Sequence, residues 1–165
     1  MDAIFTRQSI RKFENREVEP EKIETILRAG MSAPSGGNQR PWELFVVKDQ
    51  DTIGRLAKSS PYAGSAAGAK VVIVPCYRTE KLVYPELLFF DMSACVENML
   101  LAITASGLGG VWLSIAPYEE RMQNVDEILG IGGNIRSFAL VPVGYPGMQR
   151  PERDRYEEKK VHEIF

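Results

Sequence analysis

Histidine is almost absent from this sequence of 165 residues, and its absence argues against several kinds of active site. The single histidine, His162, lies among the last four residues. A Ser-His-Asp triad needs a well-placed imidazole, and zinc or non-haem iron sites commonly use two or three of them. The composition therefore disfavours histidine-based hydrolysis and predicts no metal site. We expect that any chemistry comes from a bound cofactor; the alternative is that the chain carries out no chemistry.

Cysteine is also scarce, and its spacing gives no redox or metal motif. Cys76 and Cys95 lie inside segments predicted to be buried, and no Cys-x-x-Cys pair is present. Free buried thiols are typical of a reducing compartment. Residues 1–5 include an acid and no long apolar run, so no secretory signal is indicated. We expect a cytoplasmic protein.

Neither sign of charge dominates the chain, since 25% of the residues are charged and the net charge is −2. This balance predicts no nucleic-acid partner, because a polyanion-binding surface needs an excess of Lys and Arg. The glycine clusters 107–110 and 130–133 lack the Gly-x-Gly-x-x-Gly pattern between strand and helix. A Rossmann fingerprint is therefore absent, and no motif distinguishes NADH from NADPH. Length and the lack of repeats predict one domain over residues 1–165.

What the sequence does contain is one long apolar stretch, residues 86–107, which predicts a central helix. At 100° per residue its polar side chains gather in a narrow stripe formed by Glu86, Ser93, Glu97 and Thr104. The stretch could cross a bilayer by length, but Asp91, Glu97 and Asn98 would each be costly in lipid. We therefore expect a soluble core helix and no membrane partner, with Asp91 and Asn98 hydrogen-bonded. Such apolarity suggests a dimer core, with burial inside one subunit as the alternative.

The rest of the chain mixes strand-like and helix-like segments. Apolar runs predict four strands, at residues 43–48, 70–77, 111–115 and 137–144. Further helices are predicted at residues 1–10, 20–33, 51–59 and 117–129. Residues 63–69 have small side chains and fit either a close-packed helix or a loop. The mixture indicates an α+β fold with helices against a sheet. The polar residues 148–165 are predicted to form a C-terminal arm, either solvated or wrapped around a partner subunit.

Two segments carry candidate ligand-binding groups. Arg7 and Arg11 are four residues apart, so a helix would project both guanidinium groups from one face, close to Ser9. This arrangement suits an anion, and a solvated basic face is the alternative. Residues 34–42 combine prolines, glycines and short polar side chains. Such a loop lets backbone approach a ligand closely, or simply connects a helix to a strand.

Four short motifs stand out along the chain. They are Arg7-Gln-Ser-Ile-Arg-Lys-Phe13, Ala33-Pro-Ser-Gly-Gly-Asn-Gln-Arg-Pro-Trp42, the pair Asp91 and Asn98 before Gly107-Leu-Gly109, and Val143-Gly-Tyr-Pro146. In sequence and order they resemble the FMN-dependent nitroreductase family, over about residues 3–155. The chain looks like a short member without a large helical insertion. Arg40 stands where the family commonly has Gln.

The resemblance implies an α+β sandwich, with a mostly antiparallel central sheet flanked by helices. It further implies a homodimer formed through the long central helix, with FMN at the interface. The FMN phosphate would be held by a set of residues near the two chain ends: Arg7, Gln8, Ser9, Arg153 and Arg155. Arg11 would reach the flavin near N1 and O2, where a fixed cation favours the reduced state. A loop of the partner subunit would add contacts from Pro34, Ser35, Gly36 and Asn38. A segment near flavin N5 would add contacts from Trp112, Leu113 and Ser114.

The implied reaction is hydride transfer from NADH or NADPH to FMN, followed by reduction of a nitroaromatic, quinone or similar acceptor in a ping-pong cycle. No catalytic side chain is implied, because the chemistry takes place at flavin N5. One alternative is a non-catalytic dimer that binds or stores flavin. Another is a different reaction of the same superfamily, such as dehalogenation or flavin fragmentation.

Overall fold

A six-stranded antiparallel sheet lies at the centre of the computed structural model, which describes residues 2–148, 151 and 154–165. The strand order is β1-β2-β6-β3, with β4 paired to β6 and β5 paired to β2. The strands are β1 (Trp42–Val47), β2 (Val71–Arg78), β3 (Gly109–Gly110), β4 (Leu113–Ser114), β5 (Ile135–Ser137) and β6 (Ala139–Gly144). The expectation of a mostly antiparallel sheet is confirmed.

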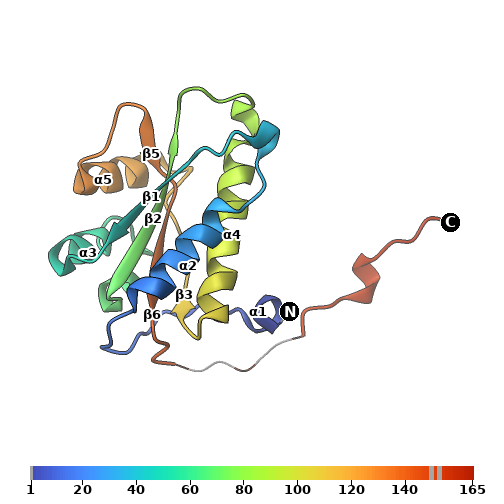
Figure 1. Ribbon diagram of the computed structural model, residues 1–165, viewed down its shortest axis with the longest axis horizontal. Helices are drawn as coiled ribbons and strands as arrows, with labels where there is room; N and C mark the ends of the chain where they lie inside the picture. Colours follow the sequence, from blue (N-terminus) through green and yellow to red (C-terminus); the bar gives the residue numbers. More distant parts are fainter. Residues whose placement is uncertain (1, 149–150, 152–153) are drawn as a thin grey trace.

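Helices cover both sides of this sheet. Figure 1 shows α2 (Pro20–Met31) and α4 (Leu88–Ala105) together on one side, with α3 (Gln50–Leu56) and α5 (Glu119–Leu129) on the other. The short helix α1 (Asp2–Thr6) packs against α4. Single 3-10 turns occupy Gly36–Asn38, Gly64–Gly68, Pro85–Leu87 and Glu158–Lys160. The predicted α+β class, with helices against a sheet, is therefore correct.

The strand predicted at residues 111–115 is wrong as a continuous element. The antiparallel register pairs Gly110 with Val143 and Leu113 with Leu140, so Val111 falls opposite Pro142. Proline has no N–H to donate, and the ladder is interrupted there. Two short strands, β3 and β4, result.

The helix predicted over residues 1–10 is also too long, because it ends at Thr6. Beyond that point the chain joins the sheet edge. Ser9 forms a parallel bridge with Gly110, and the Ile10 N–H donates to the Gly110 carbonyl at 2.9 Å. A backbone that pairs with a strand cannot also continue a helix. Residues 63–69, left open above, are mostly a 3-10 turn.

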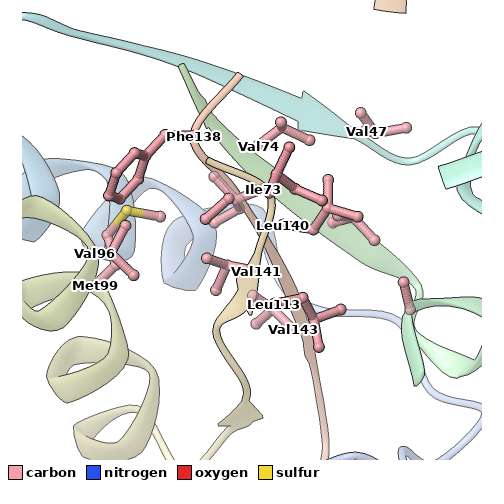
Figure 2. Close-up of a cluster of buried hydrophobic side chains, with 14 of the residues drawn as sticks. Val47, Ile73, Val74, Val96, Met99, Leu113, Phe138, Leu140, Val141 and Val143 are labelled. Atoms are coloured by element: carbon pink, nitrogen blue, oxygen red, sulfur yellow. The ribbon is translucent and has the colours of Figure 1, made fainter. Parts of the chain in front are cut away.

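The core lies between α4 and the strands. Figure 2 shows Val96 and Met99 extending from α4 toward the strands, with Phe138 beside them. Ile73 and Val141, which are partners in the β2–β6 register, are completely buried. By length and composition alone, Pro85–Ala105 could cross a bilayer. Its packing against the sheet and α2 supports the expected core helix instead.

Close packing of α2 on α4 depends on a glycine. A Cβ atom placed on Gly30 would lie 2.7 Å from Met99 Cγ, so only a residue without a side chain fits here. Asn98, which directly precedes Met99 in α4, donates from Nδ2 to the Ala29 carbonyl at 3.1 Å. This contact confirms the expectation that Asn98 has a hydrogen-bond partner.

Both thiols are free and buried, as predicted. Burial raises the pKa of Cys76 and raises the pKa of Cys95 to about 12. A thiolate in an apolar interior is poorly solvated, so the neutral form is favoured. Neither thiol is a nucleophile at neutral pH.

Met99→Ala should lower the free energy of unfolding by about 2–5 kcal/mol, because it removes a fully buried side chain at the α2–α4 contact. Met31→Ala is the matched control, since Met31 on α2 is 52% exposed and its truncation should change stability by less than about 0.5 kcal/mol. Urea titrations followed by circular dichroism measure both. Equal losses in the two variants would contradict the packing of α4.

Candidate functional site

A cavity of about 400 Å³ lies where the segment after α1 meets the C-terminal tail. Its walls carry three cationic side chains and a hydroxyl, together with apolar and amide groups. The lining residues are Phe5, Arg7, Gln8, Ser9, Arg11, Pro151 and Arg155. The structure thus brings together five residues predicted for the cofactor phosphate and pyrimidine. Arg153, the sixth of that group, lies outside the described residues.

The backbone of this segment is fixed by the sheet edge. Ser9 bridges Gly110 of β3, and Ile10 packs where a side chain on Gly109 would stand. A Cβ atom on Gly109 would approach Ile10 Cβ to 2.7 Å, which explains the need for glycine. The helix-face argument for Arg7 and Arg11 was therefore wrong in its geometry. The two residues are brought to one cavity by a strand-like segment instead.

Positive charge is in excess in the cavity. Within the described ranges, the one ion pair made by its three arginines joins Arg7 Nε to Glu97 Oε1 of α4 at 3.3 Å. Arg11 and Arg155 make no ion pair with any described residue. Guanidinium groups stay charged at all ordinary pH values and bind phosphate oxygens through paired N–H groups. The cavity is therefore suited to a group with two negative charges.

A hydrogen bond joins the tail to the segment that lines the cavity. Gln8 Nε2 donates to the Pro151 carbonyl at 3.2 Å. Beyond this point, residues 154–165 are exposed and extend away from the body of the molecule (Figure 1). Ile164 and Phe165 at its end are almost completely exposed. The exposed apolar side chains at the C-terminus are consistent with the expected arm. That this arm wraps around a partner subunit stays a prediction.

The predicted ligand loop, residues 34–42, lies against the first turn of α4, where a buried aspartate binds it. Asp91 is 5% exposed and accepts hydrogen bonds from Gly36 N at 2.8 Å and Gln39 Nε2 at 2.6 Å. This confirms the prediction that Asp91 has partners. The Gln39 amide also accepts from the N–H groups of Val83 and Tyr84, at 3.1 and 3.0 Å. Gln39, which sequence reasoning missed, therefore joins α4, the loop and the segment before α4.

The conformation of this loop is set from both sides. Arg78 of β2 donates to the carbonyls of Gln39 and Arg40, and Ser35 Oγ accepts from Arg40 N at 3.0 Å. Asn38 and Arg40 have left-handed backbone angles, with φ of 54° and 44°. Such angles are rare for residues with side chains and persist only where surrounding contacts hold them.

Within one subunit, the loop and the arginine cavity are separate. The loop meets α4 at Asp91, whereas the cavity segment meets it at Glu97, and no loop residue lines the cavity. A shared site between Arg7 and the predicted loop residues Pro34, Ser35, Gly36 and Asn38, supplied by a second subunit, is therefore a proposal. Their contact with a cofactor remains a prediction.

The third predicted group, Trp112 to Ser114, lies at the interrupted sheet edge. Leu113 is buried and pairs with Leu140, while Ser114 is exposed and its carbonyl accepts from Arg121 at 3.2 Å. The Trp112 ring is half-buried and lies 5.6 Å from the Phe138 ring. None of the three residues lines the arginine cavity.

One buried hydroxyl has no partner within the described part of the chain. Ser65 Oγ, in the turn Gly64–Gly68, makes no hydrogen bond to a described residue. Burying a hydroxyl without a hydrogen bond is costly, so such groups are few in native proteins.

Known proteins resemble this chain in both fold and sequence. The family model described as "Nitroreductase family" matches residues 4–78 and 60–145. An Archaeoglobus fulgidus protein, provisionally named NADH dehydrogenase/NAD(P)H nitroreductase, is 41% identical over 155 residues, covering 93% of this chain and 87% of the relative. The chain is an oxidoreductase and belongs to the nitroreductase family.

Solved structures agree with this assignment. A Clostridium acetobutylicum protein, provisionally named NADH oxidase, has a TM-score of 0.94 and 42% identity, with 98% of each chain covered. A Desulfovibrio desulfuricans protein, provisionally named nitroreductase and solved in complex with FMN, has a TM-score of 0.84 and 30% identity. That comparison covers 99% of this chain and 96% of the other. The nitroreductase fold expected from the motifs is confirmed.

Asp91→Ala should lower the free energy of unfolding by about 2–4 kcal/mol, because it leaves the Gly36 N–H and the Gln39 amide without their acceptor. Asp51→Ala, at an exposed position of α3, is the control and should change stability by less than about 0.5 kcal/mol. Thermal unfolding followed by circular dichroism gives both values. An unchanged Tm in Asp91→Ala would show that the loop does not depend on this acid.

Proposed function

We propose that the chain is an FMN-dependent oxidoreductase that takes hydride from NADH or NADPH and reduces nitroaromatic, quinone or similar acceptors in a ping-pong cycle. The observation that supports it most is the cavity that joins Arg7, Ser9, Arg11 and Arg155. The Desulfovibrio relative solved with FMN supports the cofactor, and the Archaeoglobus relative's name supports the hydride donor.

The residues present fit a flavin phosphate. A phosphate monoester carries close to two negative charges, and the cavity offers three guanidinium groups and a hydroxyl. Arg7, Ser9 and Arg155 would hold the phosphate, assisted by Gln8 and by Arg153, which lies outside the described residues. Arg11 would face the pyrimidine end of the ring, where its fixed charge favours the electron-rich form. Bound FMN supplies hydride and electron transfer, and the chain supplies orientation and electrostatics.

A homodimer completes this proposal. The loop residues Pro34, Ser35, Gly36 and Asn38 would reach the cofactor of the partner subunit, while Trp112, Leu113 and Ser114 would pass along the flavin edge. An apolar face is available for association along α4. Phe90 of α4 is 72% exposed, and Leu101 lines a shallow apolar groove between α1, α2 and α4. In this arrangement residues 1–165 act as one FMN-binding unit in the cytoplasm, with 148–165 as an arm.

The first experiment is an absorption spectrum of the purified protein, recorded without oxygen before and after adding NADPH or NADH. Oxidised flavin bands near about 370 and 450 nm should be present, or should develop with added FMN, and should bleach with the reductant. Turnover with menadione or a nitroaromatic should follow. Bound flavin that bleaches without any turnover would favour the flavin-storage alternative, and a protein that takes up no FMN would refute the proposal.

Arg155→Ala should weaken FMN binding by roughly tenfold to a hundredfold, because a charge-assisted hydrogen bond contributes about 1.5–3 kcal/mol. Riboflavin has no phosphate, so its affinity should stay within about twofold of the wild-type value. Quenching of flavin fluorescence measures both constants. Arg28→Ala is the matched control, since Arg28 pairs with Glu24 on the exposed side of α2. Equal losses for both flavins would argue against a phosphate site at Arg155.

A further inference from the structure

The ion pair between Arg7 and Glu97 links the cavity to the central helix. Arg7 Nε lies 3.3 Å from Glu97 Oε1, and the two side chains are 21% and 49% exposed. Glu97 does not itself line the cavity, whose walls come from residues 5–11 and from the tail. The carboxylate therefore contacts Arg7 from outside the cavity.

Little else fixes the direction of the Arg7 side chain. Helix α1, which precedes it, has no buried residue, and Ile4 and Phe5 are 61% and 72% exposed. The Arg7 backbone N–H donates to Ala3 within that same short helix. The sheet fixes the chain only from Ser9 onward. Among the described contacts, Glu97 is the one charged group that restrains the Arg7 guanidinium.

The geometry of a guanidinium group makes this contact useful for anion binding. Its five N–H donors lie in one plane, and the carboxylate of Glu97 contacts the Nε side. The two Nη groups form the opposite end of the fork, and together they offer one of the paired N–H sets that bind phosphate oxygens in bidentate fashion. A contact at Nε can therefore restrain the arginine without using the donors that a phosphate needs.

We propose that Glu97 is a positioning residue for the phosphate end of the cofactor, acting through Arg7. It anchors the guanidinium group to α4 so that the Nη pair is already directed into the cavity when the ligand arrives. This inference rests on the proposed function, because it assumes that the ligand carries a phosphate. Preorganisation of this kind raises affinity by lowering the entropy lost on binding.

Glu97 also carries a negative charge, which opposes the binding of an anion. The two effects have opposite signs, so the measured direction decides between them. Because the Glu97 side chain is half exposed, water and salt screen its field, and the repulsion is weakened. The direct contact with Arg7 is at short range and is screened less. We therefore expect the positioning effect to prevail.

The test compares FMN with riboflavin in Glu97→Ala and Glu97→Gln, using fluorescence quenching and the wild-type protein as reference. Glu97→Ala should raise the Kd for FMN about fivefold and leave that for riboflavin within about twofold. Glu97→Gln keeps the size of the side chain and a polar oxygen beside Arg7 Nε but removes the charge, and it should recover part of the loss. Glu24→Ala removes an exposed ion pair on α2 and is the control, with no change expected for either flavin.

Each other outcome has a separate meaning. Tighter FMN binding in Glu97→Ala would show that Glu97 acts as a competing charge and would overturn the proposal. An equal loss for FMN and riboflavin, or a lowered Tm, would assign Glu97 a merely structural role and would also overturn it. If the wild-type protein binds neither flavin, the proposed function itself fails, which the variants cannot mimic.

Discussion

The burial of α4 is the constraint on which the rest of the structure depends, because a helix so apolar must be covered while its few polar groups keep partners. Three of these groups lie within eight residues, and each contacts a different segment. Asp91 accepts from the loop at Gly36, Glu97 pairs with Arg7, and Asn98 donates to the carboxyl-terminal part of α2. Asp91 and Glu97 thus join the helix to the two segments that carry candidate ligand-binding residues, and Asn98 joins it to the neighbouring helix.

This arrangement divides the ligand-binding groups between two regions of one helix. The loop after α2 lies against the first turn of α4, and the arginine segment lies two turns further along. In the proposed function, each region supplies part of one site. In the proposed dimer, formed through α4, the loop of one subunit would lie near the arginines of the other, as the family resemblance implies. The proposed dimer and the proposed cofactor site are therefore linked, and one set of experiments bears on both.

Much of the fold could be predicted from the sequence, because its strongest signals are local. The apolar run of α4 and the β-branched run of β2 mark two central elements directly. What could not be predicted depends on contacts between distant residues. Nothing near Ser9 indicates that it pairs with Gly110, and nothing near Val111 indicates that Pro142 lies opposite.

The candidate site shows the same limit. The periodic spacing of Arg7 and Arg11 indicated a shared anion site for a geometrically wrong reason, since the chain there is not helical. Gln39 was missed because its role depends on Asp91, which is 52 residues away in the sequence. Arg155 could be associated with Arg7 only through the family resemblance. The role of a residue in this chain can be predicted from the neighbouring sequence only where its partners are also close in the sequence.

The buried thiols have a consequence for the durability of the protein. Burial raises the pKa of both thiols, that of Cys95 to about 12, so the neutral form predominates strongly at neutral pH. The sequence contains no other cysteine. Peroxides, quinones and other electrophiles therefore meet no reactive thiol on the folded chain. The folded chain thus offers no thiol for alkylation or for disulfide cross-linking between molecules.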